Sequence, residues 1–460
     1  MKRLPARTVF FIVIAAFIIV GIYWYYSNYQ FTRKANQILE KSEIEGGLVV
    51  HLRFNSGKLT AALHVNDCYL IHGLSPDEKK VEKARRYISD QGSYGKVSVK
   101  HWDQPDLPYA DNLVNLLVVS HAGSVSRDEM MRVLAPRGMA LIRKKGQWEK
   151  VVKPRPEGTG EWTHFRHGPQ GNPVADDSVV GPPRHLQWVS EPRWQVHHEM
   201  DQSITALVSS GGRMSYIVND VPPGIEGLPG QWYVMARNAY SGIILWKRKI
   251  PEWGWKQWSD KQVGGRFNKP IHLPRRLVAT DDKVYLTLGF NAPVTALDAA
   301  TGEKVRTYEK TQHTSEIVEK NGVLYLSVNQ GPQAPGQVEE KPAVKKHILA
   351  VNAETGEILW ESDDYSGICT SWDHLERIRR TALRVGEKHA FFLDGDHVVA
   401  LSLQTGEEQP ALLFLYPSVR LPFLQRPDFP GRYPVPGPIR MPVAVRRVSR
   451  PAVNQNACRR

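Results

Sequence analysis

Short apolar runs alternate with polar turns along most of this chain of 460 residues. In residues 42–150 these runs are separated by stretches whose apolar positions recur at helical spacing, such as residues 76–88. This alternation predicts a parallel sheet covered by helices, and therefore an α/β domain. In residues 191–410 the apolar runs are separated by turns without helical spacing, which predicts an all-β domain.

The all-β region contains a repeated turn. Four apolar strands each run into a small-residue turn that closes on a glycine, namely Gly242, Gly302, Gly356 and Gly406. Glycine is suited to these turns because it adopts a positive φ at low cost. The turns recur every 50 to 60 residues, a period that holds one four-stranded sheet and is too long for a helical pair. The spacing predicts a β-propeller of about four blades.

The N-terminus carries a candidate membrane segment. An uncharged stretch, residues 8–26, follows Lys2, Arg3 and Arg7 and ends in a run of aromatic residues. Its length matches a bilayer core of about 30 Å. We expect a transmembrane helix within residues 1–34, with the bulk of the chain outside the cytoplasm, in the periplasm or cell envelope. A cleaved signal peptide is the alternative.

The positive charge is concentrated in the tail. The net charge is +13, and residues 411–460 contain nine arginines, one acid and no lysine. The rest of the chain is close to an ordinary balance, which argues against a nucleic-acid partner. The tail is also rich in proline, so we expect it to be disordered, either as a linker or as a frameshift product that truncates the propeller. Three isolated cysteines exclude a disulfide framework.

Two motifs in the α/β region resemble a known family. Residues 107–112 precede an apolar strand, and residues 131–138 end in an Ala-Pro-Arg-Gly turn. Both are similar to late motifs of class I S-adenosylmethionine-dependent methyltransferases, over roughly 100 residues. The resemblance implies a Rossmann-like fold for residues 42–150 and a cofactor site at the carboxyl ends of its strands.

The predicted cofactor loop departs from that family. The family has a glycine-rich loop after the first strand, whereas this chain has Arg53 and Phe54 there and keeps only Gly57. The resemblance assigns Gly57, Asp77 and Asp103 as a vestigial S-adenosylmethionine site, and it identifies no catalytic residue. We therefore interpret the domain as a structural or docking domain, with cofactor binding as the alternative.

The all-β region resembles a second family. Residues 161–164, residues 180–188 and the repeated turns are similar to pyrroloquinoline-quinone-like (PQQ-like) propellers, which close with seven or eight blades. Residues 151–190 then form the linker and entry strand. A quinone enzyme of this family would need a calcium site and commonly an adjacent cysteine pair, and this sequence has no two adjacent cysteines. Trp253, Trp255 and Trp258 could line a ring-binding pocket or pack between blades.

Five histidines lie within residues 151–200, at the start of the all-β region: His164, His167, His185, His197 and His198. Adjacent histidines on a strand point to opposite faces, so His197 and His198 cannot both bind one ion without a bend. We expect loop or core histidines and no metal site.

These patterns predict an exported protein that acts as a non-catalytic binding or scaffold module. It combines an inactive methyltransferase-like domain with an incomplete PQQ-like propeller that binds a protein or glycan partner. The alternative is an enzyme, either a methyltransferase that uses S-adenosylmethionine or an oxidoreductase that uses PQQ with calcium.

Overall fold

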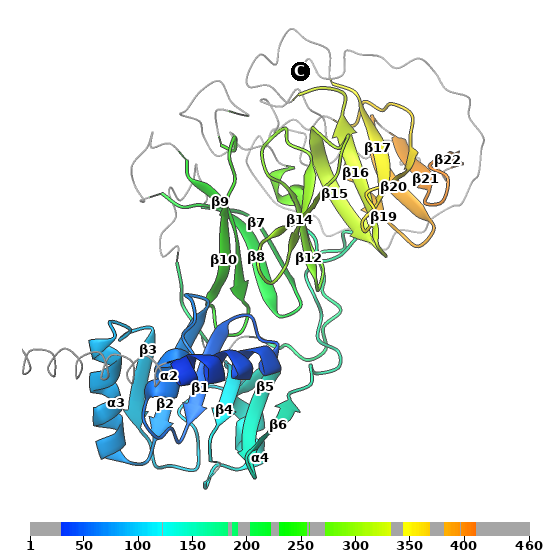
Figure 1. Ribbon diagram of the computed structural model, residues 1–460. Coiled ribbons are helices and arrows are strands. Elements are labelled where there is room, and N and C mark those ends of the chain that lie inside the picture. The colour runs from blue at the N-terminus through cyan, green and yellow to red at the C-terminus, as the bar shows by residue number, and fades with distance from the viewer. Residues whose placement is uncertain are drawn as a thin grey trace, which may run out of the picture.

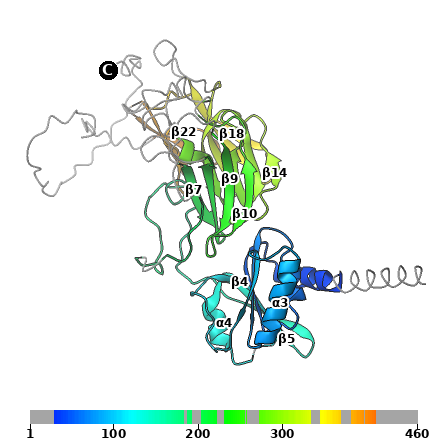
Figure 2. The same cartoon turned by 90° about the vertical axis from the view of Figure 1, so that its left-hand side faces the viewer.

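The computed structural model describes residues 29–121, 123–182, 186–191, 203–221, 230–254, 257, 272–332, 344–368, 381–395 and 397–410. An α/β domain occupies one end of the molecule and a series of β-sheets the other (Figure 1). The two parts lie one beyond the other along the long direction of the molecule (Figure 2).

The α/β domain contains a six-stranded sheet with strand order β3-β2-β1-β4-β5-β6. The first five strands are parallel, and β6 pairs antiparallel to β5. This order places β1 at the centre, and the chain changes direction across the sheet between β1 and β4, as in doubly wound nucleotide-binding folds. The strands are β1 (Gly47–Leu52), β2 (Tyr69–Ser75), β3 (Val97–His101), β4 (Val114–Val119), β5 (Leu134–Lys144) and β6 (Gln147–Val152).

Helices cover both faces of this sheet. One face packs against an N-terminal helix described over residues 29–42, α2 (Lys58–Ala62) and α3 (Glu78–Asp90), and the other against α4 (Arg127–Val133). All six residues of β1 and all six of β4 are buried, as expected for central strands of a covered parallel sheet. Asp77 and Ser126 cap α3 and α4 by accepting backbone N–H groups.

The prediction of a transmembrane helix needs correction. No helix in the part of the chain that the structure describes is long and apolar enough to cross a membrane. The N-terminal helix over residues 29–42 alternates polar residues with a buried stripe of Ala35, Ile38 and Leu39, and this stripe packs on the sheet of the α/β domain. Residues 8–26, to which the prediction was assigned, lie outside the described residues.

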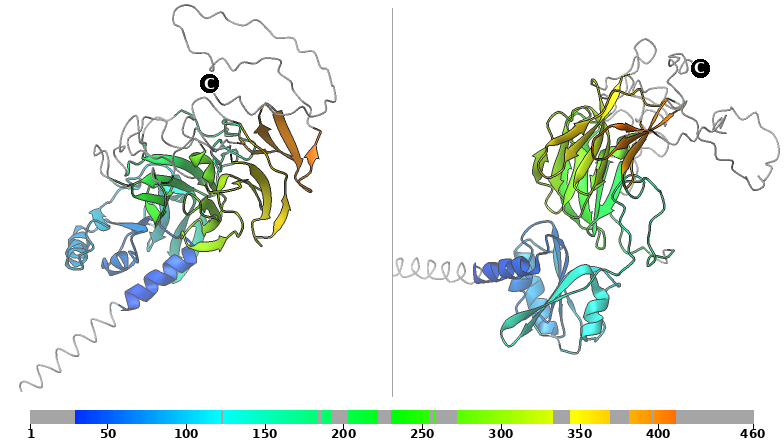
Figure 3. Two further views of the ribbon diagram at one scale, coloured as in Figure 1. Left: turned by 90° about the horizontal axis from the view of Figure 1, so that it is seen from above. Right: turned by 90° about the vertical axis from the view of Figure 1, so that its right-hand side faces the viewer.

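Four antiparallel sheets of four strands each follow the α/β domain along the described chain. Seen from above, they are arranged side by side as an arc (left view of Figure 3). Each repeated turn joins the third and fourth strands of one sheet. The strands are β7 (Ile204–Ser210), β8 (Arg213–Asn219), β9 (Trp232–Asn238) and β10 (Ile244–Lys249); β11 (Leu277–Ala279), β12 (Lys283–Thr287), β13 (Val294–Asp298) and β14 (Lys304–Thr307); β15 (Thr314–Lys320), β16 (Val323–Asn329), β17 (Lys346–Asn352) and β18 (Ile358–Glu361); β19 (Arg384–Val385), β20 (His389–Asp394), β21 (His397–Ser402) and β22 (Glu408–Gln409). A short 3-10 helix, η1 (Leu273–Arg276), precedes β11.

The repeated turn explains how neighbouring sheets pack. The ring of Trp246, from the fourth strand of the first sheet, lies on Gly302 in the turn of the second sheet, and its Nε1 donates to the Ala299 carbonyl at 3.0 Å. Trp360 makes the same contact with Gly406 and with the Leu403 carbonyl, at 2.9 Å. In the turn of the first sheet, Trp188 donates to the Ala239 carbonyl and its ring lies on Gly242. In the turn of the third sheet, the Tyr308 hydroxyl donates to the Ala353 carbonyl.

A single segment, residues 162–169, which turns back between His164 and His167, contacts the inner strands of all four sheets. Trp162 forms an isolated bridge with Ser209 of β7, and the Thr163 carbonyl accepts from the N–H of Ala279 in β11. His164 Nε2 accepts from the N–H of Glu319 in β15, and the Pro169 carbonyl accepts from Val385 in β19. The innermost strand of a blade is an edge strand with unpaired backbone groups. Residues 162–169 therefore tie the four inner edges together.

Candidate functional site

The α/β domain places its candidate site at the switch point between β1 and β4. In open α/β sheets, ligands bind outside the carboxyl ends of the strands where the strand order reverses. Here the loop after β1 begins with Arg53, which has a positive φ of 52°. The loop after β4 contains Ser120, Gly123 and Ser124. These two loops would flank a bound cofactor.

Side chains of the chain itself connect the two loops. Arg53 Nη2 lies 3.4 Å from Ser124 Oγ, and its guanidinium lies directly on Gly123, where an added Cβ would be 2.1 Å from Arg53 Cζ. One strand position before Leu52, His51 Nε2 hydrogen-bonds to Ser120 Oγ at 2.9 Å. The switch point is therefore bridged by protein side chains.

His51 is held as a neutral, buried group. Its Nδ1 hydrogen-bonds to Thr60 Oγ1 at 2.8 Å, so both ring nitrogens have partners. Burial, with a smaller contribution from the charge of Lys34, lowers the pKa of His51 to about 3. A histidine that stays neutral at all physiological pH values and lies inside the sheet serves to position the loops.

Phe54 occupies the space beside β2. Its side chain is only 2% exposed and belongs to the core on the face of α2 and α3. Gly73 of β2 is the residue that makes room for it, because an added Cβ would lie 3.0 Å from two of the ring atoms. In the sequence, Arg53 and Phe54 stand together in the loop where the methyltransferase family has glycines. The structure separates them, with Arg53 across the switch point and Phe54 in the core.

The three residues assigned to a vestigial cofactor site have different structural environments. Gly57 precedes α2 with a φ of 70°, and an added Cβ would lie 2.5 Å from the Cβ of Ala84 in α3, so this glycine allows the two helices to approach. Asp77 accepts from the Lys80 N–H at 3.2 Å as the N-cap of α3. Asp103 is exposed in the loop after β3. No contact among the described residues joins the three.

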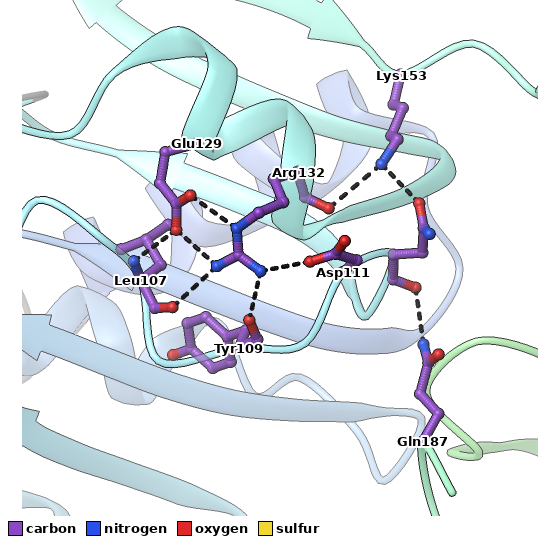
Figure 4. Close-up of polar contacts among 8 residues, drawn as sticks. Leu107, Tyr109, Asp111, Glu129, Arg132, Lys153 and Gln187 are labelled. Atoms are coloured by element: carbon purple, nitrogen blue, oxygen red, sulfur yellow. Dashed lines mark hydrogen bonds and ion pairs between the residues drawn. The ribbon is translucent and has the colours of Figure 1, made fainter. Parts of the chain in front are cut away.

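The residues of the late methyltransferase-like motifs lie at the opposite end of the strands, beside the amino ends of β4 and β5. Arg132 at the end of α4 is their centre (Figure 4). Its guanidinium makes two hydrogen bonds of 2.7 Å with the carboxylate of Glu129 and one of 2.6 Å with Asp111. It also donates to the carbonyls of Leu107 and Tyr109. These bonds hold the loop between β3 and β4 against α4.

A second set of contacts extends this cluster toward the propeller (Figure 4). Lys153 donates to Asn112 Oδ1 at 2.6 Å. The Asn112 carbonyl accepts from Gln187 Nε2, which also donates to the Tyr240 carbonyl in the turn of the first sheet, both at 3.1 Å. The motif residues therefore support the junction between the two parts of the chain. They lie away from the carboxyl ends of the strands, where the cofactor site was predicted.

Two apolar residues of the first blade contact the α/β domain: Ile243 packs against its core, and Leu245 lies on the residue before β1. Leu245 is 7% exposed, and its side chain touches Gly46 just before β1. The Leu245 carbonyl accepts from Cys68 Sγ at 2.8 Å. An ion pair of 3.0 Å between Arg137 and Asp281 adds a contact with the second blade.

Leu245 occupies a position that repeats in the next two blades. The pairing of β9 with β10 skips Leu245, that of β13 with β14 skips Val305, and that of β17 with β18 skips Leu359. Each is the extra residue of a β-bulge, a feature that redirects a side chain out of the ladder. Val305 is 54% exposed and Leu359 is 46% exposed. This repeat of apolar residues is visible in the sequence, because each residue lies three positions after the turn glycine. Our sequence analysis did not identify it.

Of the other residues considered in the propeller, Trp253 and His164 are core residues, and His167 is half-buried in a turn with its ring against Trp162. Trp253 is buried and packs edge-on against Phe290, while Trp255 and Trp258 lie outside the described residues. His164 is buried between Thr163 and β15, and burial lowers its pKa to about 3. His185, His197 and His198 lie outside the described residues, and within the described ranges no three His, Cys, Asp or Glu side chains gather as metal ligands.

Comparisons with known proteins match the two parts of the chain separately. Residues 233–411 match the family model described as PQQ_2, outer membrane protein assembly factor BamB. This match covers less than half of the chain, and it supports the predicted PQQ-like repeats. No curated protein is similar enough to count as a match.

Solved structures match the other part. A proposed S-adenosyl-L-methionine-dependent methyltransferase from Methanococcus maripaludis is 22% identical over 24% of this chain and 54% of its own, with a TM-score of 0.23. The [4+2]-cyclase SpnF is 20% identical over 25% of this chain and 47% of its own, with a TM-score of 0.23. A SAM-dependent methyltransferase from Aquifex aeolicus is 20% identical over 24% and 62%, with a TM-score of 0.22. The chain spans about half the length of the first of these structures. The Rossmann-like character of the domain follows from its strand order.

Proposed function

We propose that this chain is a non-catalytic binding or scaffold protein, in which the methyltransferase-like domain is inactive and the PQQ-like blades contact a partner. One observation carries the first half of the proposal. The switch point, where a Rossmann-like domain would receive its cofactor, is bridged by Arg53 lying on Gly123 and by the hydrogen bond from His51 to Ser120. A cofactor would have to displace these contacts to bind there.

The exposed bulge residues support the second half of the proposal. Leu245 already joins the first blade to another domain of the same chain, and Val305 and Leu359 present similar apolar side chains at the same position of the next two blades. The family model that matches these blades is named for an outer membrane protein assembly factor. This name supports a protein partner over a glycan, and it fits the predicted location of the chain outside the cytoplasm.

The bulge residues can be tested with the full chain and a denatured bacterial porin as the probe. We expect saturable binding to the wild type, and a loss of at least tenfold in affinity, about 1.4 kcal/mol, in the double variant Val305→Glu/Leu359→Glu. Val65→Glu is a matched control, because Val65 is 44% exposed on the α/β domain. Equal affinity of all three proteins would contradict the proposed surface, and binding of peptidoglycan fragments in place of porin would identify a glycan partner.

The alternative function is that of an enzyme, either a methyltransferase or a PQQ-dependent oxidoreductase. Melting of the full chain with PQQ and calcium tests the second of them, because a ligand at 100 times its dissociation constant stabilises the folded state by about 2.7 kcal/mol. We expect the melting temperature to stay unchanged. An increase that requires both PQQ and calcium would favour the oxidoreductase.

A further inference from the structure

A solvent-open pocket of about 330 Å³ lies between the N-terminal helix and the hairpin of β5 and β6. Three cationic side chains line it: Arg33 and Lys34 from the helix, and Arg143 from the end of β5. The amides of Gln30 and Gln37 and the ring of Trp148 complete the polar and aromatic lining. No acidic residue is among the lining residues of this pocket.

The pocket lies beside the carboxyl ends of the parallel strands, where ligands bind in this fold. Arg143 follows Ile142, which pairs with Val119 at the carboxyl end of β4, and Val119 pairs with Leu52 at the carboxyl end of β1. Lys34 is near enough to the switch point for its charge to affect the buried His51. The pocket therefore opens beside the bridged switch point, on the face that the N-terminal helix covers.

The positive charges in the pocket have no ion-pair partner in the described part of the chain. The acid closest in sequence to Arg143, Glu149, is bound to Lys144 and Arg127. It follows Trp148 on β6, so it points to the opposite face of the sheet. Lys150 is paired with Glu43. Burial and the neighbouring charge of Arg143 both lower the pKa of Lys34, as expected where like charges meet without compensation.

We propose that this pocket binds a phosphate-bearing anion, either a small phosphate monoester or the phosphate of a lipid headgroup. The guanidinium groups of Arg33 and Arg143 can each donate two hydrogen bonds to phosphate oxygens, and Lys34 supplies a third positive charge. The ring of Trp148 offers an apolar surface to the organic part of the ester. The volume is near the lower end of the range for small-molecule sites, about 300–1,000 Å³, which fits a small ester.

Calorimetric titration of the full chain with phenyl phosphate tests the proposal. We expect 1:1 binding that weakens as the salt concentration rises, and at least a tenfold loss of affinity in each of the variants Lys34→Gln and Arg143→Gln. Arg143→Lys should fall between the wild type and Arg143→Gln, because it keeps the charge and loses the planar pair of donors. Arg86→Gln is the matched control, since Arg86 is 81% exposed on α3, and its affinity should equal that of the wild type.

Vesicles distinguish the two sources of phosphate. Preference of the wild type for phosphatidic acid over phosphatidylcholine vesicles, abolished by Arg143→Gln, without binding of phenyl phosphate, would assign a lipid phosphate. Binding of phenyl phosphate assigns a soluble ester. The proposal is overturned if the wild type binds neither phenyl phosphate nor phosphatidic acid preferentially, or if Lys34→Gln and Arg143→Gln bind as tightly as the wild type.

Discussion

The ring of Phe54 lies so close to Gly73 that a methyl group on this glycine would stand 3.0 Å from two ring atoms. This contact joins the loop after β1 to β2 and keeps Phe54 in the core of the α/β domain. The loop that would hold a cofactor in a Rossmann-like domain is therefore fixed by its own hydrophobic anchor.

We expect Gly73→Ala to destabilise the α/β domain by about 1–3 kcal/mol, because an extra methyl group in a packed core forces the neighbouring side chains to shift. Denaturant unfolding of the full chain measures this change. Gly181→Ala is the control, since no atom lies within 4 Å of its added Cβ. Adding Phe54→Leu to Gly73→Ala should recover part of the lost stability. An equal stability of Gly73→Ala and wild type would mean that Phe54 is not packed as described.

The contact between Trp246 and Gly302 predicts a matched pair of variants in the propeller. Gly302 and Gly322 have similar positive φ values, 70° and 78°, but an added Cβ on Gly302 would lie 2.5 Å from Trp246, whereas Gly322 has no atom within 4 Å. Both alanine variants carry the backbone cost of a positive φ. We expect Gly302→Ala to cost a further 1–3 kcal/mol or so from the clash with Trp246. Equal free energies of unfolding would argue against aromatic packing on the turn glycine.

A buried carboxylate joins the third and fourth blades. Glu316 in β15 accepts from the backbone N–H groups of Thr381, Ala382 and Leu383, and it pairs with Arg275 at 3.2 Å. Burial raises the pKa of Glu316, but the charges of Arg275 and Lys346 and the N–H groups of Ala382 and Leu383 together outweigh it, so its pKa lies below the ordinary value of 4.5.

This lowered pKa predicts how stability depends on pH. A carboxyl whose pKa is depressed in the folded state stabilises the fold above its unfolded pKa, and this stabilisation is lost as the pH falls below about 4.5 toward the folded pKa. Glu316→Gln should remove about 3–5 kcal/mol at neutral pH, since it leaves Arg275 buried without its partner charge. It should also flatten the loss of stability below pH 4.5, which urea unfolding at several pH values measures. The exposed Glu309→Gln variant should behave as wild type, and an unchanged pH dependence in Glu316→Gln would contradict the pairing.

Among the bulge residues, we expect only that of the first blade, Leu245, to hold the α/β domain against the propeller. Leu245→Lys should place a charge against Gly46 and separate the two parts of the chain, because Leu245 is buried in that contact. Leu359→Lys changes the equivalent residue of the third blade, which is 46% exposed, so it should leave the junction intact. Limited proteolysis between residues 153 and 203 reports the difference as faster cleavage in Leu245→Lys alone. Equal cleavage rates in the two variants would mean that Leu245 does not hold the domains together.

Much of the architecture could be predicted from local patterns. The turn glycines mark the four sheets, because a positive φ after an apolar strand is a local requirement that only a few residues meet. The α/β domain followed from the alternation of apolar runs and helical spacing. The contacts of residues 162–169 with four inner strands could not be predicted in this way, since Ser209 and Val385 approach the segment only after the sheets have packed.

The candidate site was less predictable. The bulk of Arg53 and Phe54 was visible in the sequence, but their opposite directions depend on the positive φ of Arg53 and on the space above Gly73. Gly57 and Asp77 matched the expected positions of a cofactor site, yet both have structural explanations in the packing and capping of helices. The cationic pocket escaped notice because Lys34 and Arg143 are more than 100 residues apart in the sequence.

Equilibrium binding of labelled S-adenosylmethionine to the full chain tests the central claim most directly. Because Arg53 and His51 bridge the switch point, we expect no saturable binding up to about 1 mM ligand, a limit that corresponds to less than about 4 kcal/mol of binding free energy. A contradictory result would be saturable, stoichiometric binding at micromolar concentration that Gly57→Val or Asp77→Ala abolishes. It would show that the α/β domain has a working cofactor site and would restore the methyltransferase hypothesis.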